Sequence, residues 1–231
     1  MTVAFSDRAR SPHLLTFWLC WMLAALIGGA TAALGGDTMR AVVLGVAAVA
    51  LLQAVMLPAS GVVATAWFLV SAAAGTLGLW LATIGGIAVA SGPSGPGWQE
   101  GLAVWAVVSG LGGLVLGIAQ GALLGRWPTA LTWTATNALA AGIAWPAGLA
   151  LGYRHGADVA ARMSHMTAWL GPNLDVPVSA ATLSAGVALA ATFHAAATGL
   201  VLAILLRREV EARRVERFTL RRFPTIPAQH R

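Results

Sequence analysis

The sequence contains no lysine, and between Arg40 and Glu100 it contains no charged side chain of any kind. A helix needs about 20 apolar residues to cross a hydrocarbon core about 30 Å thick, so this stretch is long enough to cross twice. Further apolar runs of similar length follow until Arg207. The lack of charge therefore indicates an integral membrane protein.

Other absences narrow the function. Cys20 is the only cysteine, which excludes an intramolecular disulfide and leaves a redox role without a second thiol. The absence of lysine most simply reflects a GC-rich coding bias, although arginine also binds lipid phosphate in a bidentate manner. No Asp, Glu, Lys or Arg lies in the middle of an apolar run. Ion-coupled transporters use such a group at mid-depth, so that class is disfavoured.

The composition agrees with a membrane protein, since 58% of the residues are hydrophobic, 10% are charged and the mean hydropathy is +0.77. A net charge of +6 would suggest a nucleic-acid partner in a soluble chain. However, eight of the fourteen arginines follow Leu206, beside the expected membrane. We therefore expect membrane lipids, and no nucleic acid, as partners.

Uncharged runs bounded by polar or turn residues predict an all-α bundle of six transmembrane helices. These cover approximately residues 13–34, 40–57, 61–90, 101–125, 129–153 and 179–206. Residues 1–206 then form the membrane domain, and residues 207–231 form a basic tail. Residues 154–179 are expected to contain a short surface helix at the lipid interface.

The distribution of arginine predicts the orientation, because flanking arginines are retained on the cytoplasmic side. Arg8, Arg10, Arg126 and the tail arginines fall on one side of a six-span bundle. Both termini are therefore expected in the cytoplasm, with the chain in a bacterial inner membrane. The first run also fits a cleaved signal peptide, but its length and its two tryptophans, Trp18 and Trp21, favour a retained helix.

Two predicted helical hairpins resemble each other. The residues that recur, at offsets of 65 to 67 positions, are Gln53, Trp67, Ser71 and Trp80 in the first hairpin and Gln120, Trp133, Asn137 and Trp145 in the second. A further fragment, GLVLGI from Gly113, returns as GLVLAI from Gly199. These matches predict duplicated hairpins.

A Gly-rich helix with a glutamine near its inner end, an Arg-containing turn and a helix with Trp and Asn resembles a group of uncharacterised bacterial polytopic membrane proteins. The resemblance covers Gly113–Gly152 best and Leu51–Gly86 less well, and the earlier hairpin lacks the turn arginine. It implies a topology and no activity.

The fourth predicted helix carries small residues at four-residue steps, namely Ser109, Gly113, Gly117, Gly121 and Gly125. Residues four apart share one face of a helix, so another helix can approach closely along this stripe. The fifth predicted helix offers a similar run, which consists of Thr132, Thr136, Ala140, Ala144, Gly148 and Gly152. We expect these two helices to pack antiparallel through these stripes; the alternative is a glycine-lined pore.

Four polar side chains lie inside the apolar runs: Gln53, Gln120, Asn137 and His194. In the predicted topology they converge in the inner half of the membrane. His194 is the only deep ionisable group, and such groups are candidates for function. Because His194 lies on another small-residue stripe, we expect its ring to hydrogen-bond to an amide or hydroxyl on a neighbouring helix. The alternative is catalysis or proton transfer.

Six spans with a serine in the fourth and a histidine in the sixth match the layout of rhomboid intramembrane proteases, which would pair Ser109 with His194. The sequence around Ser109 lacks that family's local motif, and the second run has no His or Asn for an oxyanion site. We therefore expect no catalytic residues.

No cofactor is expected, since haem commonly needs two histidines and only His194 is deep. His155, Asp158 and His165 match no strong metal-binding pattern, so no metal is expected either.

The sixth helix is expected to continue into the basic tail, because Arg207 and Glu211 are four residues apart. Its arginines would contact anionic lipid headgroups or a partner; they are Arg207, Arg208, Arg213, Arg214, Arg217, Arg221 and Arg222.

Tight-packing stripes and few reactive groups favour a non-enzymatic membrane scaffold or complex subunit, which would bind a membrane protein or a second copy. The alternatives are a carrier or channel for a small neutral or lipidic molecule, and a membrane enzyme that uses His194. A cavity that reaches Asn137 and His194 would favour transport, whereas a closed, dry bundle would favour the scaffold.

Overall fold

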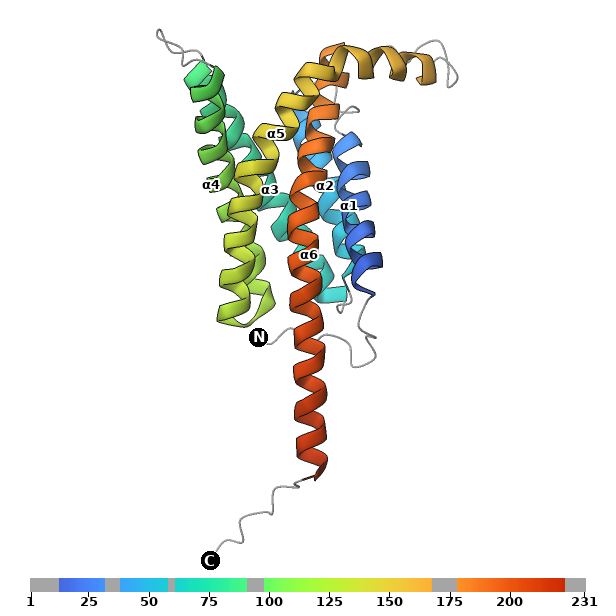
Figure 1. Cartoon of the computed structure of the whole chain (residues 1–231), viewed down its shortest axis with the longest axis vertical. Coiled ribbons are helices and arrows are strands. Elements are labelled where there is room, and N and C mark those ends of the chain that lie inside the picture. Colours follow the sequence, from blue (N-terminus) through green and yellow to red (C-terminus); the bar gives the residue numbers. More distant parts are fainter. Residues whose placement is uncertain (1–12, 32–37, 58–60, 91–97, 168–177, 223–231) are drawn as a thin grey trace, which may run out of the picture.

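The computed structural model describes residues 13–31, 38–57, 61–90, 98–167 and 178–222. In these ranges the apolar runs form six α-helices (Figure 1), so the all-helical prediction is confirmed. The helices are α1 Leu14–Ala30, α2 Thr38–Met56, α3 Gly61–Ala90, α4 Trp98–Leu124, α5 Trp127–Thr167 and α6 Val178–Arg222.

Two helices extend beyond the predicted membrane spans. α6 continues past Leu206 to Arg222, as predicted, and Arg207 Nε donates to Glu211 Oε1 at 2.9 Å. α5 was predicted to end at residue 153, before a separate surface helix, but it continues to Thr167. Its last turns cross over one end of the bundle (Figure 1). Pro146 lies inside α5, and no further proline follows before Thr167, so no proline ends the helix at residue 153.

The six helices form a closed ring. Each helix packs against the next one along the chain, and α1 packs against α6, which completes the circle. Successive helices run in opposite directions, and α6 projects from one end of the ring, here called the tail end (Figure 1). α1, α3 and α5 therefore begin at the tail end, and α2 and α4 finish there.

Glycine allows close approach at each interface of the ring. A Cβ added to Gly28 would lie 2.6 Å from the backbone nitrogen of Val49, and one added to Gly29 would lie 2.8 Å from Cα of Ala188. The other interfaces hold Gly75 (α2 and α3), Gly78 with Gly112 (α3 and α4), Gly113 and Gly117 (α4 and α5), and Gly148 (α5 and α6). Close backbone contact of this kind is what holds helices together when burial from lipid provides no driving force.

The small-residue stripe of α4 does face α5. A Cβ on Gly117 would lie 2.7 Å from Cα of Thr134, and one on Gly121 would lie 3.2 Å from the carbonyl oxygen of Ala130. Gly125 does not belong to this contact: α4 ends at Leu124, and Gly125 is in the connecting turn with φ 75°. Only glycine adopts this backbone conformation without strain, so Gly125 sets the turn and not the packing.

The face of α5 that meets α4 is not the predicted one. Thr132 is exposed and donates to the carbonyl of Pro128, while Thr136 donates to the carbonyl of Thr132. Thr134 and Ala141 contact α4 instead, and Gly148 contacts Ala190 on α6. α5 packs against both α4 and α6, so it needs small residues on two faces. The predicted stripe combined residues from both of these faces.

Large apolar side chains cover the outside of the ring. All six helices expose such residues, among them Leu23 on α1, Val55 on α2, Leu69 on α3, Val107 on α4, Ile143 on α5 and Phe193 on α6. The buried side chains include Gln53, Gln120, Asn137 and Thr198. This inverts the usual arrangement of a water-soluble protein and suits an apolar surrounding.

Among the described residues, three helices are long and apolar enough to cross a membrane, through the segments Val63–Trp80, Ala103–Leu124 and Ala185–Arg208. α1 and the Val42–Met56 segment of α2 are apolar but shorter. Membrane association is thus supported by three helices, and six spans remain a prediction.

Candidate functional site

A cavity of about 90 Å³ lies at the centre of the ring, and residues of all six helices line it. All four polar side chains singled out from the sequence reach it: Gln53 from α2, Gln120 from α4, Asn137 from α5 and His194 from α6. None of the lining side chains carries a permanent charge. The structure therefore brings the predicted polar cluster together around an empty, uncharged space.

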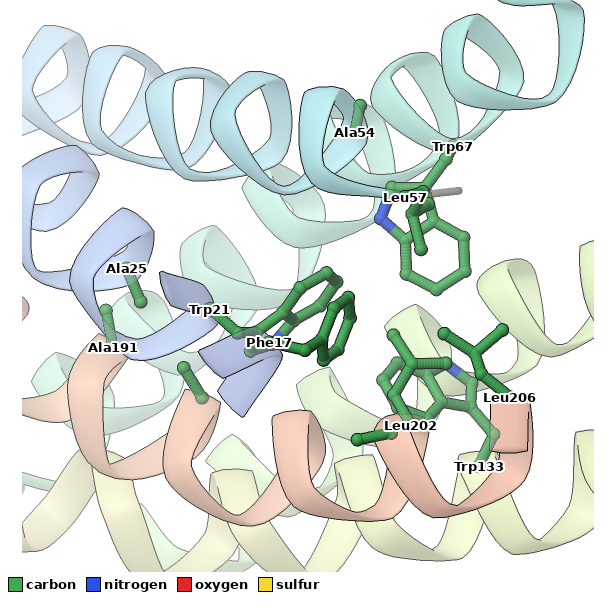
Figure 2. Packing of buried hydrophobic residues seen from close by; sticks show 12 residues of the cluster. Phe17, Trp21, Ala25, Ala54, Leu57, Trp67, Trp133, Ala191, Leu202 and Leu206 are labelled. Atoms are coloured by element: carbon green, nitrogen blue, oxygen red, sulfur yellow. The ribbon is translucent and has the colours of Figure 1, made fainter. Parts of the chain in front are cut away.

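Three indoles pack in a row inside the ring, each on a helix that begins at the tail end, and we call them the tryptophan floor (Figure 2). The ring centroids of Trp21 and Trp67 are 6.3 Å apart, and those of Trp67 and Trp133 are 5.8 Å apart. Phe17 stacks on Trp21 at 5.4 Å. Each tryptophan is 1% exposed and lies about two turns from the tail end of its helix. Large apolar rings here exclude water from that end of the cavity.

The sequence analysis did not assign this role to the tryptophans. Trp67 and Trp133 were recognised as equivalent positions of two hairpins, and Trp21 was used only to argue for a retained first helix. The sequence did contain a signal for this role, because each of the three tryptophans lies six or seven residues after the start of its helix. Equivalent positions in helices that begin at the same end meet at the same depth.

Gln120 joins three helices through its amide. Its Oε1 accepts a hydrogen bond from Trp133 Nε1 at 3.0 Å, and its Nε2 donates to Ser71 Oγ at 2.7 Å. The indole N–H can only donate, which fixes the orientation of the amide. Asn137 Nδ2 donates to the backbone oxygen of Trp133 at 3.0 Å. α3, α4 and α5 are thus connected by buried polar contacts beside the cavity.

The other two indoles of the floor do not share this arrangement. Trp21 Nε1 and Trp67 Nε1 are buried and have no hydrogen-bond partner among the described residues. If the fragments that begin at Gly113 and Gly199 are equivalent, Leu206 stands where Gln120 stands in the earlier copy. A leucine cannot accept the bond, which explains the free N–H of Trp21.

Gln53 and His194 also keep free hydrogen-bonding groups. Within the described part of the chain, no hydrogen bond joins the Gln53 amide to another residue. His194 Nε2 is shielded from solvent and likewise has no partner there. Nε2 therefore does not make the bond predicted between the His194 ring and a neighbouring helix within the described residues, and the backbone oxygen of His194 accepts from Thr198 Oγ1.

A smaller cavity of about 40 Å³ lies between α3, α4 and α5, and we call it the side chamber. Ser109 lines the side chamber, whereas His194 lines the central cavity. Ser109 Oγ has no hydrogen-bond partner among the residues that the structure describes. The two residues therefore do not form the dyad of a rhomboid protease.

The remaining sequence candidates lie away from the central cavity or outside the described residues. No group of three potential metal ligands occurs among the described residues; His155 is exposed, and the side chains of Asp158 and His165 lie outside the described part. Arg207 and Arg208 are exposed on the projecting part of α6. The other tail arginines lie on the same helix, but the side chains of Arg213, Arg214, Arg217, Arg221 and Arg222 are outside the described part.

No protein-family model, curated protein or solved structure matches the chain. The likeness to other polytopic proteins therefore remains a prediction from the sequence, and function has to be argued from the cavity.

Proposed function

We propose that this protein is a six-span membrane protein that carries a small neutral molecule through its central cavity. The outward apolar side chains support six spans, because α1, α2 and α5 expose them as α3, α4 and α6 do. The placement of arginines supports a bacterial inner membrane with both termini in the cytoplasm. In that orientation the tail end of the ring is the cytoplasmic end.

The observation that carries the proposal is the free hydrogen-bonding capacity around the central cavity. Trp21 Nε1 and His194 Nε2 line it and have no partner among the described residues, and the Gln53 amide lines it beside them. An unmet buried polar group costs about 1–3 kcal/mol, so a bound molecule that supplies the missing bonds is stabilised there. A scaffold held by packing alone has no need of such groups.

The size and charge of the cavity define the cargo. A water molecule takes about 30 Å³ in the liquid, and a cavity of about 150 Å³ holds benzene. A space of about 90 Å³ therefore suits a molecule of a few non-hydrogen atoms and excludes a lipid chain. An ion buried without a counter-charge costs far more than a neutral solute, so the cargo is neutral and bears both donors and acceptors.

Solute flux into proteoliposomes, measured by stopped-flow light scattering with small amides, ureas and alcohols, tests this proposal. At least one solute should enter faster than into protein-free vesicles. Gln53→Leu should slow that flux about 3- to 10-fold, equivalent to the loss of one hydrogen bond. Val55→Leu, on the exposed face of α2, is the matched control and should leave the flux unchanged. Equal rates with and without protein for every solute would refute the carrier.

A scaffold or complex subunit is the second candidate, and the projection of α6 beyond the ring favours it (Figure 1). This helix presents Arg207 and Arg208 outside the bundle, where they can contact anionic headgroups or a partner protein. Truncation after Leu206 separates the two functions. Loss of a copurifying membrane protein with unchanged solute flux would assign partner binding to the α6 extension.

A further inference from the structure

We propose that the side chamber is a second solute site, on the route by which cargo reaches the central cavity from the end of the ring opposite the tail end. This inference rests on the proposed carrier function. It adds the direction of access, a residue that binds cargo on the way, and the side chain that separates the two spaces.

Ser109 is the first observation. It is 3% exposed, and its Oγ has no partner among the described residues. Hydroxyls within helices commonly bond to the carbonyl four residues earlier, and Thr132, Thr136, Thr192 and Thr198 all do so here. Ser109 differs from them: it lines the side chamber with its hydroxyl unused. Glycines supply much of the remaining wall, so the hydroxyl is the polar group that a solute meets there.

The second observation is that the two cavities share part of their walls. Gly75, Leu116 and Trp145 line both of them. Two of these have bulky side chains, and Trp145 is half-buried. A rotation of the Trp145 indole would join the side chamber to the central cavity, so Trp145 is the partition between the two sites.

The direction of access follows from depth along the helices. Trp145 lies twelve residues beyond Trp133 on α5, which is about 18 Å along the axis. α5 begins at the tail end (Figure 1), so the side chamber is displaced from the tryptophan floor toward the opposite end. The floor blocks passage at the tail end, and the side chamber provides the way in from the other.

Thiol accessibility tests the route in membrane vesicles of both orientations, with Cys20→Ser as the background. In Ser109→Cys, a membrane-impermeant methanethiosulfonate reagent should react from the side opposite the tail, and the transported solute should slow the reaction. Ala195 is 2% exposed and lines the central cavity. The thiol of Ala195→Cys should therefore react more slowly than that of Ser109→Cys. Adding Trp145→Ala should accelerate this reaction at least tenfold.

Leu111→Cys is the matched control, because Leu111 is 56% exposed on the outside of the same helix and a thiol in lipid does not ionise. Reaction of Ser109→Cys only from the tail side, or from neither side, would overturn the route. If solute protects Ala195→Cys while Ser109→Cys stays unreactive, the side chamber is refuted and the carrier stands. If both thiols react and no solute protects either, the carrier is refuted together with the solute site.

Ser109→Ala provides a second measurement that does not depend on labelling. It removes the hydroxyl without adding volume, so stability in detergent should be unchanged or higher, since a buried unpaired group is lost. Solute flux should fall about 3- to 10-fold. Wild-type flux in this variant would show that the hydroxyl does not contact cargo.

Discussion

Gln120 is the residue through which polar contacts hold one half of the ring together. Its amide bonds to Ser71 on α3 and to Trp133 on α5, and it is 3% exposed. In an apolar surrounding these bonds have no competition from water, so their loss leaves two buried groups unmet. Gln53 occupies the equivalent place in the other hairpin and makes no such bonds to described residues. Two glutamines that line the same cavity thus differ in their bonds to the described residues.

Gln120→Leu should destabilise the protein by about 1–3 kcal/mol, because Trp133 and Ser71 lose their partner in the interior. Gln53→Leu exchanges the amide for an apolar side chain of similar size and should leave stability unchanged or raise it, because no bond to a described residue is lost. Equilibrium unfolding in detergent, monitored by tryptophan fluorescence, distinguishes the two variants. Equal stability losses in the two variants would show that the Gln120 bonds contribute nothing specific.

At the scale of the helix, the contact between α4 and α5 leaves room for a methyl group at one glycine of α4 and not at another. A Cβ at Gly117 would meet the backbone of Thr134 at 2.7 Å, whereas a Cβ at Gly110 would meet its nearest atom, the carbonyl oxygen of Ala138, at 3.4 Å. Backbone cannot move aside as a flexible side chain can. A Cβ at Gly117 therefore forces α4 and α5 apart, whereas a Cβ at Gly110 does not.

Gly117→Ala should consequently lower the unfolding free energy by about 1–3 kcal/mol, as overpacking does. Gly110→Ala adds the same methyl group to the same helix, and it should be neutral or slightly stabilising because alanine favours helix over glycine. Thermal unfolding of both variants in one detergent is a sufficient measurement. A stable Gly117→Ala protein would mean that the two helices are not held at this distance.

Uncharged apolar runs predicted the helices, and the four-residue spacing of small residues predicted the α4 stripe, because that spacing repeats within one element. It did not predict the matching face of α5, since Thr134 and Gly148 serve different neighbours and a single sequence does not say which neighbour each face meets. The tail-side limit of α4 was also misplaced by one residue, because Gly125 continues the four-residue spacing while its backbone turns. The polar cluster was predicted from the depth of its four residues along the expected helices, which placed them at similar levels of the bundle.

At the scale of the whole molecule, the ring has an apolar outer surface and a partly polar interior that contains the central cavity. The cavity could not be predicted from sequence, because its volume is a small difference between the space enclosed by six helices and the side chains that fill it. The tryptophan floor depends on the same difference between enclosed space and side-chain volume. Three indoles fill the space near the tail end, and smaller side chains leave a cavity farther from it.

The six-span topology can be tested on the intact protein with single cysteines in the Cys20→Ser background. Trp127→Cys, at the tail-end turn, should react with an impermeant thiol reagent only from the cytoplasmic side, and His155→Cys only from the opposite side, because α5 carries the chain across between them. Both native side chains are exposed. Reaction of both thiols from one side would exclude α5 as a span.

The pairing of α1 with α6 has a consequence for biosynthesis. Trp18 on α1 donates its indole N–H to the carbonyl oxygen of Ala196 at 2.6 Å, and Gly29 lies against Ala188. The ribosome makes α1 before these partners, so α1 lacks them until α6 has been synthesised. A nascent chain that stops before α6 is an open arc, because the contact of α1 with α6 that closes the ring has not yet formed.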